Sequence, residues 1–371
     1  MHSSSSSGSR LCLRSLFSSL PVKILVLSTA LVPFHAINAS KTPAHQFDSV
    51  VNSNKLTVVA VKSPTTVFEE GGHLHGFGYD LVRNYAKNMN VKLDFKTVSD
   101  DATALKMVAQ GKANMAMTTS TIGSIEARKL TSFSATCGDG SSLSSKGLNA
   151  NLNWVFKSAN DPLSQTASNF VCNSKQSGAI NQLASFYNQN VVEEHFRDNI
   201  HQDLSQRLPI YKASFQRSAQ QYGLDWHLLA AIGYQESYLK PNSVSPTGVR
   251  GLMMLTSSTA KAMGVNNRTD PVQSIEGGAK YYDKMLSRFE HIPMPDRNWY
   301  ALVAYNMGPG AVQKIQNSIR NQGKDPDNWV NLYSYLEHNK ASNGRYRQAL
   351  QYVTRIRSYL EQIKSSELVN I

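Results

Sequence analysis

One glutamate, Glu236, stands where a carboxyl group could act as an acid. A helix is expected over residues 226–237, because Asp225 can accept hydrogen bonds from its first free amides. In that helix Leu229, Ile232 and Glu236 follow the i, i+3, i+7 spacing that shares one apolar face. Apolar surroundings raise the pKa of a carboxyl group, so that it holds a proton near neutral pH as a general acid must. Periodicity by itself favours the alternative, a solvated residue in the last turn.

The elements around this helix are expected to be helical as well. Strand patterns disappear from about residue 204, and apolar residues then recur at helical spacing. We therefore predict an all-α domain over residues 204–371, large enough to bury one core. Its further helices are expected at residues 211–222, 256–263, 274–289, 299–305, 311–321 and 345–363.

The preceding part of the chain alternates strands with helices. β-Branched or alternating runs of strand length predict strands, and apolar residues at helical spacing lie between them. This order indicates right-handed crossovers and a mainly parallel sheet, hence an α/β domain over residues 55–200. The expected strands are 56–61, 91–95 and 115–118, and the helices are 80–89 and 102–109.

The N-terminus has the pattern of an export signal. Residues 1–39 join a basic, serine-rich stretch to a short apolar run and then to small residues, which is typical of a cleaved signal peptide. A polar leader is expected at residues 40–54. In an exported chain Cys137 and Cys172 are more often bridged than free, the alternative being two buried thiols. No cysteine or histidine cluster has metal-ligand spacing, so we expect no metal site.

The chain of 371 residues has a formal net charge of +12, and the excess lies mainly in its second half. Residues 201–371 hold 20 basic and 13 acidic residues, which favours an anionic partner. Nucleic acid, an anionic lipid surface and an anionic wall polymer all have this charge. Export and the lack of a nucleic-acid-reading motif argue against nucleic acid.

Three ordered blocks carry a family resemblance. The blocks AIGYQES (231–237), SPTGVRGLMML (245–255) and AYNMG (304–308) resemble those of lytic murein transglycosylases with a lysozyme-like fold, in particular the membrane-bound F group. Residues 76–81, 111–116 and 124–128 resemble the first lobe of family 3 extracellular solute-binding proteins. The second lobe of those proteins is missing, because too few residues remain to build it. The resemblance thus implies a single-lobe periplasmic-binding-like α/β domain before a lysozyme-like domain.

The resemblance also assigns roles to individual residues. Glu236 would be the catalytic acid and base, and the other members would bind or position the sugar. Many family members carry glutamine where this chain has Met254, although the membrane-bound branch often has methionine there. From the residues alone, Tyr305 and Tyr352 are equally compatible with core positions. The residues expected at the substrate are Ser237, Met253, Met254, Tyr305, Asn306 and Tyr352.

The activity implied is cleavage of the N-acetylmuramic acid–N-acetylglucosamine bond of peptidoglycan strands, in cell wall turnover and remodelling. Glu236 would protonate the glycosidic oxygen and then deprotonate the muramoyl 6-hydroxyl, which leaves a 1,6-anhydromuramoyl end and needs no cofactor. We expect an exported, periplasmic protein that is at most peripheral on the outer membrane. Rival readings are a lysozyme-type hydrolase with a second carboxylate, a non-enzymatic protein that binds or senses muropeptides or amino acids, and an inactive wall-binding protein.

Overall fold

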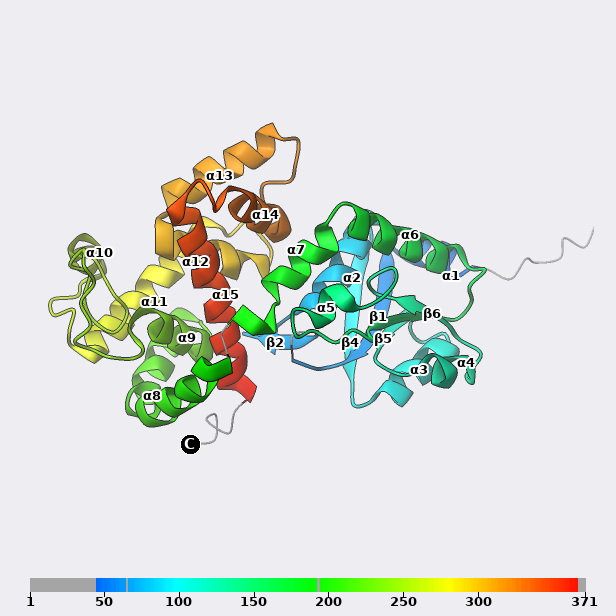
Figure 1. Ribbon diagram of the computed structural model, residues 1–371, viewed down its shortest axis with the longest axis horizontal. Helices are drawn as coiled ribbons and strands as arrows, with labels where there is room; N and C mark the ends of the chain where they lie inside the picture. Colours follow the sequence, from blue (N-terminus) through cyan, green and yellow to red (C-terminus); the bar gives the residue numbers. More distant parts are fainter. Residues whose placement is uncertain (1–44, 65, 192–193, 366–371) are drawn as a thin grey trace, which may run out of the picture. The chain divides into compact units, whose positions relative to one another are not determined.

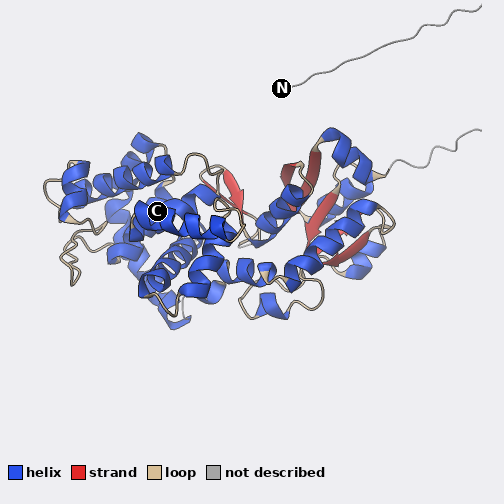
Figure 2. Ribbon diagram, turned by 90° about the horizontal axis from the view of Figure 1, so that it is seen from above, coloured by secondary structure: helices blue, strands red, loops and turns tan. Residues whose placement is uncertain are grey.

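The computed structural model describes residues 45–64, 66–191 and 194–365, which lie within one compact unit. The predicted signal peptide at residues 1–39 lies outside the described residues. Strands occur only before helix α6 in this part of the chain, and the remainder is helical (Figure 1; Figure 2). The predicted order of an α/β domain followed by a helical domain is confirmed.

A five-stranded sheet with the order β4-β1-β5-β7-β6 forms the centre of the α/β domain (Figure 1). β1 runs parallel to β4 and β5, because helices α2 and α3 make the crossovers between them. β7 runs antiparallel to β5 and β6, so the predicted parallel arrangement holds for the first three strands only. The elements are β1 (Lys55–Val61), α2 (Phe77–Asn88), β4 (Lys92–Val98), α3 (Asp101–Ala109), β5 (Met115–Thr118), β6 (Thr131–Ser134) and β7 (Asn153–Phe156).

The alternation of side chains along β1 explains the layers. Val58 belongs to the apolar cluster that contains Leu81 and Tyr85 of α2. Its neighbour Val59 belongs to the cluster that contains Leu105 of α3. Because successive residues of a strand point to opposite faces, the two helices cover opposite faces of the sheet.

Further elements complete this domain, among them a helix at its N-terminal end. Part of the predicted polar leader forms helix α1, whose Val50 is fully buried. The Asp161 carboxylate accepts hydrogen bonds from the amides of Gln46 and Phe47 at 2.6 and 3.2 Å, so residues 46–53 pack on the domain and differ from the expected leader. The remaining elements are α1 (Gln46–Ser53), β2 (Phe68–Glu70), β3 (His73–His75), α4 (Ile122–Glu126), α5 (Ser141–Ser144), α6 (Pro162–Gln176), α7 (Ala179–Phe186) and a 3-10 turn at Gln189–Val191.

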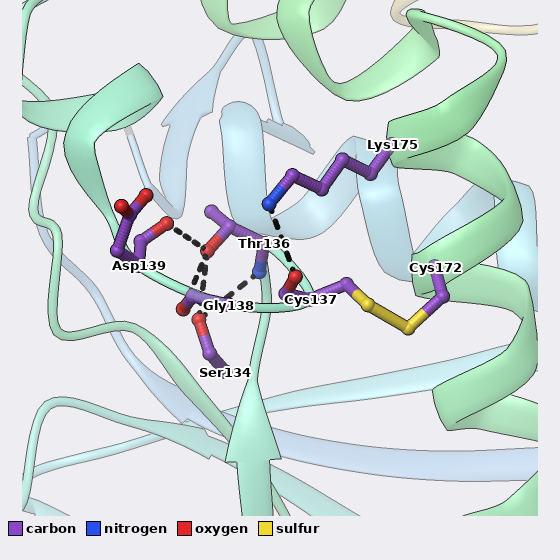
Figure 3. The surroundings of a disulfide bond; sticks show 7 residues. All are labelled: Ser134, Thr136, Cys137, Gly138, Asp139, Cys172 and Lys175. Carbon is purple, nitrogen blue, oxygen red and sulfur yellow. Dashed lines mark hydrogen bonds between the residues drawn. A yellow bond between two sulfur atoms is a disulfide. The ribbon is translucent and has the colours of Figure 1, made fainter.

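A disulfide joins Cys137, in the loop after β6, to Cys172 in helix α6 (Figure 3). Lys175, about one turn further along α6, donates to the carbonyl of Cys137 at 3.1 Å. Thr136 holds the same loop, because its hydroxyl donates to the carbonyl of Asp139 at 2.9 Å. Of the two alternatives left open by the sequence, the structure therefore shows the bridge.

The helical domain differs from the prediction in two helices. Helix α8 begins well before the predicted residue 211, and continues through Pro209, because Leu204, Leu208 and Phe215 form a buried stripe along it. Helix α14 was not predicted, although Leu332 and its neighbours also form a buried stripe. The helices are α8 (Glu194–Tyr222), α9 (Trp226–Ser237), α10 (Ser257–Met263), α11 (Pro271–Arg288), α12 (Asp296–Met307), α13 (Pro309–Asn321), α14 (Trp329–Asn339) and α15 (Gly344–Ser365).

The two domains share one hydrophobic core. Phe186, at the end of α7, packs edge-on against Trp299 and Trp329, with 5.1 Å between ring centroids in each pair. Arg83 of α2 forms an ion pair at 2.6 Å with Asp296 at the start of α12. The helical domain is therefore stabilised in part by the α/β domain.

Removal of the disulfide provides a test of how much it stabilises this chain. The double variant Cys137→Ser/Cys172→Ser should lose about 3–4 kcal/mol of unfolding free energy, because the bridge closes a loop of about 35 residues in the unfolded chain. Urea denaturation followed by tryptophan fluorescence measures the loss. Reductant should lower the midpoint of the wild type but not of the variant, and equal midpoints without reductant would contradict the expectation.

Candidate active site

Helix α9 carries Glu236 in its last turn. The helix begins as predicted at the cap Asp225, whose carboxylate accepts the amide of His227 at 2.8 Å. It ends because Tyr238 adopts the left-handed conformation, with φ of 55°. Residues 228–234 are buried, so the helix runs through the core and brings Glu236 to its edge.

Glu236 is half-buried and receives one short hydrogen bond. The hydroxyl of Tyr352, on α15, donates to Glu236 Oε1 at 2.6 Å. Burial raises the pKa of Glu236 to about 7, and the hydrogen bond from Tyr352 opposes the rise. No acidic side chain of the described residues contributes to this pKa shift. Near neutral pH roughly half of the Glu236 carboxyls hold a proton, which suits a group that first donates a proton and then accepts one.

A second tyrosine lies against the first. The ring of Tyr305, on α12, is nearly parallel to that of Tyr352, at 14° and with 6.4 Å between centroids. Its hydroxyl donates to the carbonyl of Met253 at 3.1 Å. Burial raises the pKa of both phenols well above the usual value, so both remain hydrogen-bond donors over the whole neutral range.

Residues 251–254, here called the methionine loop, have an unusual backbone. Gly251 has φ of 92°, and a Cβ atom there would lie 1.8 Å from the carbonyl oxygen of Arg268. Only glycine fits this position. Met254 also has a positive φ, 48°, which is rare for a residue other than glycine. Such a backbone persists only where surrounding contacts hold it.

Three hydrogen bonds supply those contacts. The hydroxyl of Ser237 donates to the carbonyl of Leu252 at 2.7 Å, and Tyr305 donates to the next carbonyl. The amide of Met253 donates to the hydroxyl of Ser274 at 3.1 Å. The residue after Glu236 thus ties helix α9 to the methionine loop, while the same loop is tied to α11 and α12.

Two of the predicted substrate contacts lie in the core. Ser237 is 3% exposed, and Met253 has no exposed surface. The side chain of Met253 packs on Gly278, where a Cβ atom would come within 2.7 Å of it. For Met253 this differs from the expectation that it lines the sugar groove, since its side chain packs beneath the methionine loop. Ser237 is too buried to contact the sugar, but its hydrogen bond to Leu252 agrees with the expectation that it steadies the site.

The other predicted residues retain some solvent-exposed surface. Met254 and Asn306 are half-buried, and Asn306 directly follows Tyr305 at the end of α12. Tyr305 and Tyr352 are both buried, at 9% and 4% exposure, yet Tyr352 reaches the carboxyl of Glu236. The sequence could not decide between a core position and a cleft position for Tyr352. Its ring is buried in the core, whereas its hydroxyl binds the carboxyl of Glu236.

Two further acidic residues of the helical domain, Asp270 and Glu276, lie at a helix cap and on the surface. Asp270 caps α11 by accepting the amide of Gln273 at 2.8 Å, as its sequence context indicates, and Glu276 is exposed. In the described parts of the chain, no group of three or more histidine, cysteine, aspartate or glutamate residues could hold a metal ion.

Sequence reasoning missed two residues beside the site. Ser274 is fully buried and holds the methionine loop, but no local pattern marks it. Tyr238 is 53% exposed, packs edge-on against Tyr234 at 5.4 Å, and its carbonyl accepts a hydrogen bond from Arg207 at 3.0 Å. The only sequence signal for Tyr238 is its place directly after the Glu-Ser pair.

Comparison with known families divides the chain at the same place as the fold. Residues 213–328 match the family described as Transglycosylase SLT domain, and residues 56–190 match the Bacterial extracellular solute-binding proteins, family 3. The first region contains all the predicted site residues except Tyr352 and the two cysteines. The chain therefore contains one region that is similar to the transglycosylase SLT domain and one that is similar to the family 3 solute-binding proteins.

The similar curated proteins are named membrane-bound lytic murein transglycosylase F. That of Marinobacter nauticus is 40% identical over 226 residues, which are 57% of this chain and 45% of the relative. That of Stutzerimonas stutzeri is 39% identical over 243 residues, 58% of this chain and 50% of the relative. A protein of Alkalilimnicola ehrlichii with the number 1 after this name is 52% identical over 134 residues, 36% and 27% of the two chains. The chain spans about half the length of the first two relatives.

A solved structure of an inactive variant of lytic transglycosylase Slt from Pseudomonas aeruginosa is 20% identical. The match covers 54% of this chain and 35% of that structure's chain, with a TM-score of 0.34.

The raised pKa of Glu236 should cost stability at neutral pH. Because the folded-state pKa of about 7 exceeds the ordinary value of 4.5, the wild type loses unfolding free energy as pH rises from about 4.5 through 7. Glu236→Gln has no such loss, so its melting temperature should exceed that of the wild type by an amount that grows between pH 5 and pH 8. The gain at pH 8 should be on the order of 3 kcal/mol, because each unit of the pKa shift corresponds to about 1.4 kcal/mol.

Thermal unfolding at pH 5, 6, 7 and 8 measures this difference. Glu276→Gln, an exposed residue of α11, is the matched control and should show no growing gain. A constant offset between Glu236→Gln and the wild type at all four pH values would show that Glu236 titrates normally.

Proposed function

We propose that this protein is a peptidoglycan lytic transglycosylase. It cleaves the bond between N-acetylmuramic acid and N-acetylglucosamine and leaves 1,6-anhydromuramoyl ends, in cell wall turnover and remodelling. The observation that carries the proposal is the Glu236 carboxyl, whose pKa is raised to about 7 and which Tyr352 holds at 2.6 Å. The match of residues 213–328 to the transglycosylase SLT domain supports it.

A single carboxyl group is enough for this reaction. Ordinary glycosidases use two carboxylates, the second as nucleophile or as base for water. The pKa of Glu236 is shifted by burial and Tyr352 only, so no second acid of the described residues lies close enough to raise it. In the proposed reaction the sugar itself supplies the nucleophile, its 6-hydroxyl, and its N-acetyl group can assist at the anomeric carbon.

The hydrogen bond from Tyr352 gives the two carboxyl oxygens of Glu236 different roles. Oε1 accepts the phenolic proton, which leaves Oε2 as the oxygen that carries the transferable proton. Glu236 gives that proton to the glycosidic oxygen as the bond breaks. The carboxylate then takes the proton of the 6-hydroxyl as that oxygen closes on C1, and Tyr352 stabilises the charge between the two steps.

Each supporting residue has a place in this scheme. Ser237 and Ser274 hold the methionine loop, which keeps Met254 at the edge of the site. Tyr305 fixes the same loop from α12. In the proposed scheme Asn306, the next residue of α12, would donate to the N-acetyl group or a neighbouring sugar oxygen. No metal or organic cofactor takes part in these steps.

We also propose that the protein acts outside the cytoplasm, in the periplasm and peripherally on the outer membrane. The export pattern of residues 1–39 and the word "membrane-bound" in the names of its relatives support this. Within the described ranges, no helix has the length and apolar character needed to cross a bilayer. The disulfide between Cys137 and Cys172 fits an oxidising compartment.

The products test the function directly. Mass spectrometry of soluble products from purified peptidoglycan should show muropeptides lighter by one water than reducing-end muropeptides. Glu236→Gln should lower their rate of formation by at least about a thousandfold, because it removes the proton donor. Glu276→Gln should form them at the wild-type rate.

Other outcomes would replace the proposal. Reducing ends would identify a hydrolase on this fold. If the folded wild type formed no products, a binding function would remain, and titration with muropeptides and amino acids would locate it in the α/β domain.

The pH dependence of kcat/KM tests the pairing of Glu236 with Tyr352. The rate should fall as pH rises through about 7, because Glu236 must be protonated to donate. Tyr352→Phe removes the hydrogen bond that lowers the pKa of Glu236, so the fall should move to higher pH, while the maximum rate decreases. Tyr211→Phe, at a half-buried tyrosine of α8, should leave the profile unchanged. A downward shift with Tyr352→Phe would contradict the assignment.

A further inference from the structure

A cavity of about 420 Å³ lies beside the end of α12, in a region that the proposed chemistry does not use. Its walls come from the junction of α12 and α13 and from the start of α15. Met307 and Lys314 line it on one side, and Asn343, Arg345 and Tyr346 on the other. Met307 directly follows Asn306, so the cavity adjoins the proposed substrate contacts.

The cavity carries positive charge without a counterion. Lys314 and Arg345 both line it, and none of its lining residues is acidic. Neither cation forms an ion pair within the described ranges, and both side chains are exposed to solvent. Arg345 uses one amino group to donate to the carbonyl of Met307 at 2.8 Å, which holds its guanidinium at the cavity wall. The remaining N–H groups of Arg345 are free to bind an anion in a planar, bidentate manner.

The position of Arg345 relative to the acid follows from helix geometry. Arg345 and Tyr352 are seven residues apart on α15, so they lie on the same face, two turns or about 10 Å apart. Tyr352 contacts Glu236 directly. A substrate cleaved at Glu236 therefore has the cationic cavity about two sugar rings' length away along α15.

We propose that this cavity binds a carboxylate of the peptide carried by a muramoyl residue of the glycan strand, on one side of the cleaved bond. The inference rests on the proposed function, and it specifies the substrate as glycan that bears peptides. Glycan strands without peptides keep only the lactyl carboxylate beside each muramoyl ring and lack the carboxylates further along the peptide, which are the ones assigned to Lys314 and Arg345. The aromatic ring of Tyr346, which packs edge-on against Tyr335 at 6.0 Å, offers an apolar wall for the aliphatic part of such a peptide.

Kinetics on two substrates test this site in the full-length protein. One substrate is peptidoglycan strands that keep their peptides, and the other is the same strands after an amidase has removed them. For Lys314→Gln the ratio of kcat/KM between the two should fall about fivefold, mainly through a higher KM on the peptide-bearing strands. Lys314→Glu should lower the ratio further, and Lys314→Arg should restore it.

Arg320→Gln is the matched control, because it removes the same charge from the same helix but lies outside the cavity. It should keep the wild-type ratio, and the fall for Lys314→Gln should weaken at high salt. The melting temperature of each variant shows that it is folded. Arg345→Gln is less informative by itself, since it also removes the hydrogen bond to Met307.

The outcomes separate this inference from the function on which it rests. If the wild type cleaves neither substrate, the proposed function fails. If it cleaves both and Lys314→Gln changes both equally, or changes neither, the cavity does not bind the peptide. An equal change with Arg320→Gln would point to general attraction by the basic domain and would also overturn the assignment.

Discussion

The hydrogen bond from Tyr352 to Glu236 joins two helices 116 residues apart in the chain, and the site depends on it. For that contact α9 must pass through the core with its last turn against α15. This packing buries the carboxyl group and raises its pKa. On another side of α9, a Cβ atom at Gly233 would lie 2.9 Å from Leu252, so the missing side chain lets the methionine loop pack closely. The raised pKa of Glu236 and the position of the methionine loop thus result from the same packing of α9.

Local rules were sufficient for the framework of this site. The cap at Asp225 and the apolar stripe of α9 depend on residues within a few positions of one another, and the structure contains both. The same holds for the three parallel strands and their crossover helices. The choice of Glu236 as the acid needed more than local rules, because periodicity by itself favours a solvated residue there and only the resemblance of residues 231–237 to a known motif block singled it out.

What the sequence could not give was the direction of side chains in irregular segments. Met253 and Met254 are neighbours of one type, and one is fully buried while the other is half-buried, because the backbone turns at Met254. No periodicity reports a positive φ in a loop. The cationic cavity could not be predicted for a similar reason, since Lys314 and Arg345 come to line one cavity only after α12, α13 and α15 pack.

Helix α15 has further contacts beyond the site. Arg357 donates to the carbonyl of Asn188 at 2.7 Å, and Lys364 forms an ion pair with Asp225 at 2.7 Å, so this helix ties the α/β domain to the cap of α9. Tyr352 lies outside the region that matches the transglycosylase family. The acid and the group that tunes its pKa are therefore encoded 116 residues apart, one inside and one outside the matched region. Chains with identical motif blocks can diverge in their working pH through substitutions in α15 alone.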